Sequence, residues 1–198
     1  VVPERPEAQP IVGADGRPAW LIAAAPVPGL TLAPLVAVPA AAPTPTATTI
    51  SLENDRLRIT LDDRGRIASF YDKQAERQLL PAGEVGNRLV AYRDMPPAFD
   101  AWDIDRSFED QAWEIDELVA AEVVETGPLR AAIRLEWVYE HSRIVEVLSL
   151  AAGADRLEVD CCIDWHEHAT LVKVHLPLAL AAADSRAEIQ FGHVRRST

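Results

Sequence analysis

The sequence predicts an all-β protein built as an antiparallel two-sheet sandwich, and three observations support this. From Ile50 onward, apolar residues alternate with polar ones at a period of two, which is typical of half-buried strands. Turn residues separate many of these runs at spacings of about 10 to 15 residues, as in β-sandwiches. No segment of a dozen residues combines apolar spacing of three and four with helix caps. Together these patterns predict eight or nine strands.

The first 50 residues differ in composition from the rest. Residues 1–36 carry a short apolar run at 19–25 between glycines, which is enough for two strands. In residues 37–50, AVPAAAPTPTATTI, 12 of 14 residues are Ala, Pro or Thr, a composition typical of a linker or an extended edge. The predicted organisation is therefore a short β segment at 1–36, a linker at 37–50 and a β-sandwich domain at 51–198.

The first hairpin of the sandwich domain follows directly from the pattern. Leu57, Ile59 and Leu61 alternate with polar residues. The segment Asp62-Asp63-Arg64-Gly65 then supplies turn chemistry, and a second strand is predicted at 66–71.

The same alternation predicts two further half-buried strands. One follows the Gly127-Pro128 break and turns residues 131, 133, 135 and 137 inward; the other turns residues 157, 159, 161 and 163 inward. On this register Cys161 is a small core residue and Cys162 points the other way. Less regular patterns predict the remaining strands, at 87–93, 118–126, 143–150, 170–178 and 187–194, with room for a single helical turn at 179–186.

Charge and composition exclude several classes of function. With 31 acidic against 19 basic residues, the formal charge is -12, so the average surface repels nucleic acid and anionic lipids. No apolar stretch approaches the roughly 18 to 20 residues that span a bilayer. The adjacent cysteines are poorly placed to bridge each other, and neither has the partner that a nucleophile needs. We therefore expect no nucleic-acid partner, no membrane and no catalytic residue.

The long segment 94–117 lacks a strand pattern and is the first functional hint. Within it, Asp100, Trp102 and Asp103 combine carboxylates with an indole ring. Carboxylates accept hydrogen bonds from sugar hydroxyls, and an indole packs against the apolar face of a pyranose. These residues are the predicted substrate-binding site. The alternative is that Trp102 packs in the core while the acids cap turns.

Histidines form the other candidate sites. The segment His166-Glu167-His168 consists of residue types that can bind zinc. On a strand, however, Glu167 points away from the two histidines, so we expect no metal site here. The alternative is a strand end or turn with histidines hydrogen-bonded at the surface. His193 is predicted to belong to the substrate-binding residues by facing another domain. The alternative is that it only forms hydrogen bonds with neighbouring groups, as isolated histidines more often do.

Four ordered blocks resemble one known family. Residues 50–80 contain Glu-Asn, Gly-Arg-Ile and Tyr-Asp-Lys motifs, and MPPAFDAWDID, DWHEHATLVKVHLPL and EIQFGHVRRST follow at 95–105, 164–178 and 188–198. This arrangement is similar to the C-terminal β-domain of glycoside hydrolase family 38 α-mannosidases, in their cytosolic and bacterial branch. The Pro-rich piece before it resembles the segment that closes the family's preceding domain. The chain also lacks an initiating Met, so we expect a fragment.

The resemblance implies a galactose-mutarotase-like supersandwich, left short at its C-terminus with an exposed sheet edge. It also implies a cytoplasmic parent enzyme that hydrolyses terminal α-mannosides with retention. The nucleophile and the zinc would lie in an α/β catalytic domain elsewhere in the same polypeptide. None of the blocks matches the zinc-ligand motif, so no cofactor is expected in this segment, and the segment alone is expected to be inactive.

Two functional hypotheses follow. In the first, the segment braces the catalytic domain of an α-mannosidase acting on mannose-containing oligosaccharides, and its loop reaches the sugar site. In the second, it is a stand-alone carbohydrate-binding or protein-interaction sandwich. A lesser alternative is that the sandwich builds subunit contacts in an oligomer.

Overall fold

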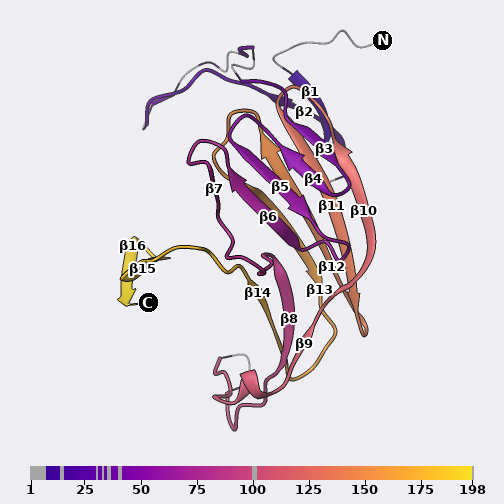
Figure 1. Ribbon diagram of the computed structural model, residues 1–198, viewed down its shortest axis with the longest axis vertical. Coiled ribbons are helices and arrows are strands. Elements are labelled where there is room, and N and C mark those ends of the chain that lie inside the picture. The colour runs from indigo at the N-terminus through magenta and orange to yellow at the C-terminus, as the bar shows by residue number, and fades with distance from the viewer. Residues whose placement is uncertain are drawn as a thin grey trace.

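A computed structural model describes residues 8–13, 16–29, 31–32, 34, 37–39, 42–99 and 102–197. These residues form sixteen β-strands and one short 3-10 helix, η1, in five antiparallel sheets (Figure 1). The all-β prediction is confirmed. From Ile50 onward the described residues form thirteen strands, more than the eight or nine predicted there, because several have two or three residues, too few to show a period.

The N-terminal hairpin pairs β1 (Ala8–Val12) with β2 (Pro18–Ile22), so the two strands predicted within 1–36 are present. The buried side chain of Gln9 fixes the hairpin to the main body. Its Nε2 donates to the Arg130 carbonyl at 2.8 Å, and its Oε1 accepts from the backbone N–H groups of Leu129 and Arg130 at 3.1 and 2.8 Å. One amide thus satisfies three backbone groups at the start of the central strand β11.

The first main sheet has the order β3-β4-β5-β6-β7. Its strands are β3 (Thr46–Thr48), β4 (Ser51–Glu53), β5 (Leu57–Leu61), β6 (Ile67–Asp72) and β7 (Arg77–Gln78). The predicted hairpin is β5–β6, and its turn is stabilised by Asp62, whose Oδ1 accepts from the backbone N–H groups of Arg64 and Arg66 at 3.0 and 2.9 Å. Strand β3, within the Ala/Pro/Thr-rich segment, forms one edge of this sheet.

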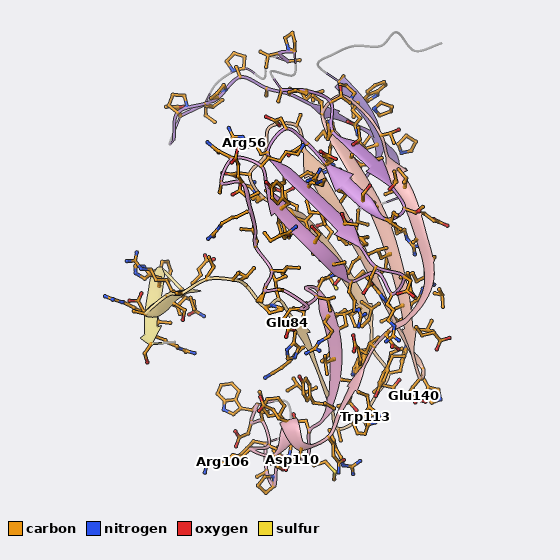
Figure 2. All side chains as sticks on the ribbon, viewed as in Figure 1. Arg56, Glu84, Arg106, Asp110, Trp113 and Glu140 are labelled. Carbon is orange, nitrogen blue, oxygen red and sulfur yellow. The ribbon has the colours of Figure 1, made fainter. Side chains whose placement is uncertain are left out.

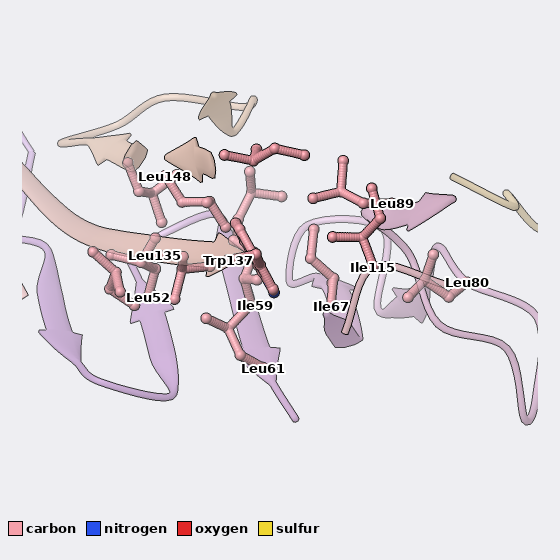
Figure 3. Packing of buried hydrophobic residues seen from close by; sticks show 14 of the residues in the cluster. Leu52, Ile59, Leu61, Ile67, Leu80, Leu89, Ile115, Leu135, Trp137 and Leu148 are labelled. Atoms are coloured by element: carbon pink, nitrogen blue, oxygen red, sulfur yellow. The ribbon is translucent and has the colours of Figure 1, made fainter. Parts of the chain in front are cut away.

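The second main sheet has the order β10-β11-β12-β13 and packs face to face on the first. Its strands are β10 (Glu117–Glu125), β11 (Arg130–Tyr139), β12 (Ser142–Ala151) and β13 (Glu158–Asp164). Figure 3 shows the apolar layer between the sheets. Its members are Leu52, Leu57, Ile59, Leu61 and Ile67 from the first sheet and Ala131, Ile133, Leu135, Trp137, Ile144, Leu148 and Leu150 from the second. The predicted sandwich is therefore confirmed.

A smaller sheet, β14-β8-β9, extends the sandwich at the lower end of Figure 1. It consists of β14 (Thr170–His175), β8 (Arg88–Arg93) and β9 (Ala112–Glu114). Leu89 and Ala91 of β8 belong to the main core, together with Ile115. The long loop that carries the predicted sugar-binding residues projects from this sheet.

Strand β13 departs from the sequence prediction. All seven of its residues are exposed, so both its half-buried character and the core position of Cys161 are wrong. Val159 and Ile163 lie opposite the fully buried Leu148 and Ile144 yet remain 44% and 47% exposed. Strand β13 is an edge strand, with no neighbour beyond it among the described residues, and its apolar face is left uncovered.

The prediction also fails near the C-terminus. The single strand expected at 187–194 is a hairpin of β15 (Asp184–Ile189) and β16 (Gly192–Ser197), and its turn contains Phe191 with φ 61°. The helical turn expected at 179–186 is absent, since that range is extended and enters β15. No helix among the described residues is long and apolar enough to cross a membrane.

The position of Cys161 leads to a test of its reactivity. Partial burial and the facing Glu146 carboxylate raise the pKa of the Cys161 thiol to about 11. In a Cys162→Ser variant, which leaves Cys161 as the one thiol of the chain, alkylation by iodoacetamide at pH 8 should be on the order of a hundredfold slower than for an ordinary free thiol. The rate should rise with pH until about 11. Adding Glu146→Gln should accelerate the reaction at pH 8, because it removes the negative charge that disfavours the thiolate; equal rates with and without Glu146 would contradict this account.

Candidate functional site

The predicted sugar-binding loop connects β8 to β10 and is fixed at its base. The backbone N–H of Arg93 donates to the Gln111 carbonyl at 3.0 Å, and that of Asp94 donates to the Ala169 carbonyl at 2.9 Å. Strand β9, which lies inside the segment expected to have no strand, pairs with β8. The loop therefore starts and ends on ordered sheet.

A cation and two aromatic rings lie beneath the loop. Phe108 of η1 (Phe108–Asp110) packs edge-on against Tyr92 with ring centroids 5.2 Å apart. The Lys173 ammonium lies 3.9 Å from the centroid of the Phe108 ring, and the Tyr92 hydroxyl is 2.6 Å from Nε2 of His175. Aromatic packing and a cation–π contact thus hold η1 against the sheet β14-β8-β9.

Carboxylates order the turns of the loop. Oδ1 of Asp105 accepts from the backbone N–H and the hydroxyl of Ser107 at 3.0 and 2.9 Å, and these bonds hold the pKa of Asp105 below its usual range. Oδ1 of Asp94 accepts from the backbone N–H of Asp105 at 2.8 Å. A shallow pocket of about 250 Å³ opens beside these turns and is lined by Arg93, Met95, Asp105, Ser107, Asp110 and Gln111.

Trp102 lies at the tip of the loop and is 90% exposed. The backbone N–H groups of Trp102 and Asp103 both donate to the Phe99 carbonyl, at 2.9 and 2.8 Å, and Phe99 has φ 57°. The alternative in which Trp102 packs in the core is therefore wrong for this chain. Phe99 is itself 76% exposed, so the tip presents two aromatic rings to solvent.

Of the other predicted site residues that the structure describes, Asp103 lies next to Trp102 and His193 lies apart from it. Oδ1 of Asp103 accepts from the backbone N–H of Ile104 at 3.1 Å. Asp100 lies outside the described residues. His193 is exposed on β16, opposite Glu188, in a hairpin that lies well apart from the loop (Figure 1). The prediction that His193 faces another domain stays a prediction.

The structure shows how the segment 164–168 is hydrogen-bonded, and among the described residues no three His, Cys, Asp or Glu side chains converge. Nε2 of His166 lies 3.0 Å from Oδ1 of Asp164. Oε1 of Glu167 accepts from the backbone N–H of His141 and the hydroxyl of Ser142, both at 2.8 Å, and these bonds lower the pKa of Glu167. The expectation of no metal in this segment stays a prediction.

Sequence reasoning missed the supporting residues of the loop, Tyr92, Phe108 and Lys173. Their pairing joins three separate elements, and no local pattern reports it. One signal was visible, since Lys173 is one of two lysines in a chain whose other basic residues are arginines.

Fold and loop together define a class, an all-β sandwich domain that presents an aromatic, carboxylate-bearing loop. Residues 52–198 match the family model described as the glycosyl hydrolases family 38 C-terminal domain, and the chain belongs to this family.

Three relatives illustrate the similarity. Alpha-mannosidase 2C1 of Homo sapiens is 32% identical over 151 residues, and Alpha-mannosidase G of Dictyostelium discoideum is 26% identical over 155 residues. Each match covers 75% of this chain and 14% of the relative, so the chain spans about one seventh of their length. A solved protein of glycosyl hydrolase family 38 from Enterococcus faecalis shares the fold, with a TM-score of 0.60 and 12% identity over 75% of this chain and 21% of its own.

Proposed function

We propose that this chain is the non-catalytic brace of an α-mannosidase, and that its parent hydrolyses terminal α-mannosides of oligosaccharides with retention. Membership of the family and the names of the curated relatives support the proposal. The brace packs against the catalytic α/β domain of the same polypeptide, which holds the zinc. The parent is a cytoplasmic enzyme.

We assign the chemistry of retention to that other domain. A retaining glycosidase uses one carboxylate as nucleophile and a second carboxyl group as acid and then base. No carboxylate of this chain is assigned either role. Its contribution to the reaction is to place a binding surface next to the substrate.

The exposed indole of Trp102 is the observation that supports placing this loop at the sugar-binding site. The base of the loop is hydrogen-bonded to the sheet, whereas the indole itself is open to solvent. A 90% exposed tryptophan leaves a large apolar face in water, which is unfavourable unless another surface covers it. A pyranose ring offers a matching apolar face, and the neighbouring carboxylates of Asp100 and Asp103 accept hydrogen bonds from its hydroxyls.

Trp102→Ala in the full-length enzyme is the direct test. We expect kcat/KM on an aryl α-mannoside to fall about tenfold, because the ring contact with substrate is lost, while zinc content per subunit stays the same. Steady-state kinetics and metal analysis measure the two quantities. The 198-residue chain alone should show no turnover.

Trp20→Ala is the matched control, since Trp20 is also exposed but lies on the N-terminal hairpin at the opposite end of the sandwich (Figure 1). This variant should keep wild-type kinetics. An unchanged kcat/KM in Trp102→Ala would remove the loop from the substrate site, and turnover by the isolated chain would overturn the non-catalytic assignment.

A further inference from the structure

A second hollow shares Arg93 with the loop pocket. Its volume is about 370 Å³, and four chain segments line it: the end of β8, strand β9, the turn between β11 and β12, and the start of β14. The lining residues are Arg93, Trp113, Tyr139, Glu140, His168, Ala169 and Thr170. The volume falls at the small end of the range for small-molecule sites, which suits one or two sugar rings.

Hydrogen bonds to the Glu167 carboxylate connect two of the chain segments that line this hollow. This carboxylate accepts from the backbone N–H of His141 and the hydroxyl of Ser142, both at 2.8 Å, and the Ser142 hydroxyl also accepts from the backbone N–H of His166 at 2.8 Å. The β11–β12 turn is therefore tied to the segment that precedes β14. The bond from the Asp94 N–H to the Ala169 carbonyl, at 2.9 Å, ties that segment to the end of β8. The hollow is thus pre-formed.

Two of its wall residues hold an unusual backbone conformation. Glu140 has φ 50° and Ala169 has φ 49°, the left-handed region that non-glycine residues seldom adopt. Glu140 begins the two-residue turn between β11 and β12, where a positive φ is ordinary hairpin geometry, and Ala169 directly precedes β14.

Aromatic rings supply the apolar surface of the hollow. The Tyr139 ring stacks in parallel on Trp165, with centroids 5.8 Å apart, which fixes its orientation. Trp113 is 47% exposed on β9, so a large part of its side chain is open to solvent. Figure 2 shows Trp113 and Glu140 near each other at the same end of the molecule.

The polar groups are of mixed charge. Arg93 brings a guanidinium, His168 an imidazole and Glu140 a carboxylate, and all three residues are exposed. Within the described ranges the side chains of Glu140 and His168 form no hydrogen bond or ion pair. A charged ligand that is attracted by Arg93 or Glu140 is repelled by the other, whereas a neutral polyol can accept from the guanidinium and donate to the carboxylate together.

From this combination we propose that the hollow is a second carbohydrate site, separate from the Trp102 loop, which binds a neutral pyranoside against Trp113 and Tyr139 with its hydroxyls on Arg93, Glu140 and His168. The site is a binding subsite and takes no part in bond cleavage. It can hold a neighbouring residue of a branched glycan, or a glycan end that tethers the substrate.

Tryptophan indole resonances of the 198-residue chain test this proposal, because five tryptophans report on different places. Titration with methyl α-mannoside should shift the Trp113 resonance saturably, with Kd on the order of 1 mM. Mannose 6-phosphate and glucosamine should bind at least about tenfold more weakly because of Glu140 and Arg93, respectively. The indole N–H of Trp137, which is bonded to the Arg64 carbonyl, reports that the chain stays folded.

Three variants complete the test. Because both Trp113 variants lose the reporting indole, isothermal titration calorimetry measures their binding: Trp113→Ala should abolish binding of the sugar, Trp113→Phe should retain it, and Glu140→Gln should weaken it about tenfold. Trp20→Ala is the matched control and should bind as the wild type. A shift confined to the Trp102 resonance would overturn this pocket while leaving the loop proposal intact. Equal binding of neutral and charged sugars, or no saturable shift of Trp113, would also overturn it.

Discussion

Replacing Trp137 with alanine is expected to lower the free energy of unfolding by about 4 kcal/mol. The side chain is 1% exposed and lies in the apolar layer between the two main sheets. Its loss removes the largest fully buried side chain and leaves a cavity that flanking strands cannot fill without breaking register. Its Nε1 also donates to the Arg64 carbonyl at 2.8 Å, so the variant leaves that carbonyl without its partner.

Urea titration followed by circular dichroism measures this loss, since tryptophan fluorescence itself changes with the mutation. Domains of this size are stabilised by only about 5 to 15 kcal/mol, so the variant should unfold at a much lower urea concentration. Trp137→Phe should recover most of the packing but not the hydrogen bond. Trp20→Ala, at an exposed position, should cost less than about 0.5 kcal/mol. A cost for Trp137→Ala as small as for Trp20→Ala would show that the sandwich core does not depend on it.

The alternation of apolar residues predicted strands well where a second sheet covers them. In β5, Leu57, Ile59 and Leu61 are buried as expected, because the facing strands of the second sheet pack on them. The same pattern predicted the strand β13 correctly, but the residues that it predicted to be buried are exposed. Alternation tells which side chains share a face, and burial depends on whether another element lies on that face.

The C-terminal hairpin shows a second limit of the pattern. The alternation of Ala187, Ile189 and Phe191 runs directly into the turn at Gln190 and Phe191, so the segment resembles one strand although the chain reverses there. The glycine was the available signal, since an isolated glycine in a strand pattern indicates a bend.

The two candidate sites were predictable to different degrees. Trp102 and Asp103 belong to one contiguous loop, and the sequence motif indicated it directly. The pocket around Trp113, Glu140 and His168 is assembled from four separate segments, and it depends on the Glu167 bonds to His141 and Ser142. No spacing in the sequence reports such an arrangement, because it arises from the register of the sheets.

The turn at Gly65, between β5 and β6, packs directly against the core residue Trp137, so that it leaves no space for a side chain at position 65. Gly65 has φ 79°, and a Cβ placed there would lie 2.7 Å from Cζ2 of Trp137 and 3.1 Å from Cδ1 of Leu118. The indole cannot move aside easily, since its Nε1 is bonded to the Arg64 carbonyl in the same turn. Gly65→Ala should therefore cost about 3 kcal/mol, combining left-handed backbone strain with overpacking.

Gly83→Ala separates these two causes. Gly83 has nearly the same backbone angle, φ 82°, but no atom lies within 4 Å of its added Cβ, so its substitution should cost only the strain, about 1 kcal/mol. In a Trp137→Phe background the smaller ring should leave room for the Gly65 methyl group, and the cost of Gly65→Ala should fall toward that of Gly83→Ala. Such non-additivity, measured by urea titration of the four variants, would be the signature of direct contact. Additive costs would mean that backbone strain alone explains why glycine occupies this turn.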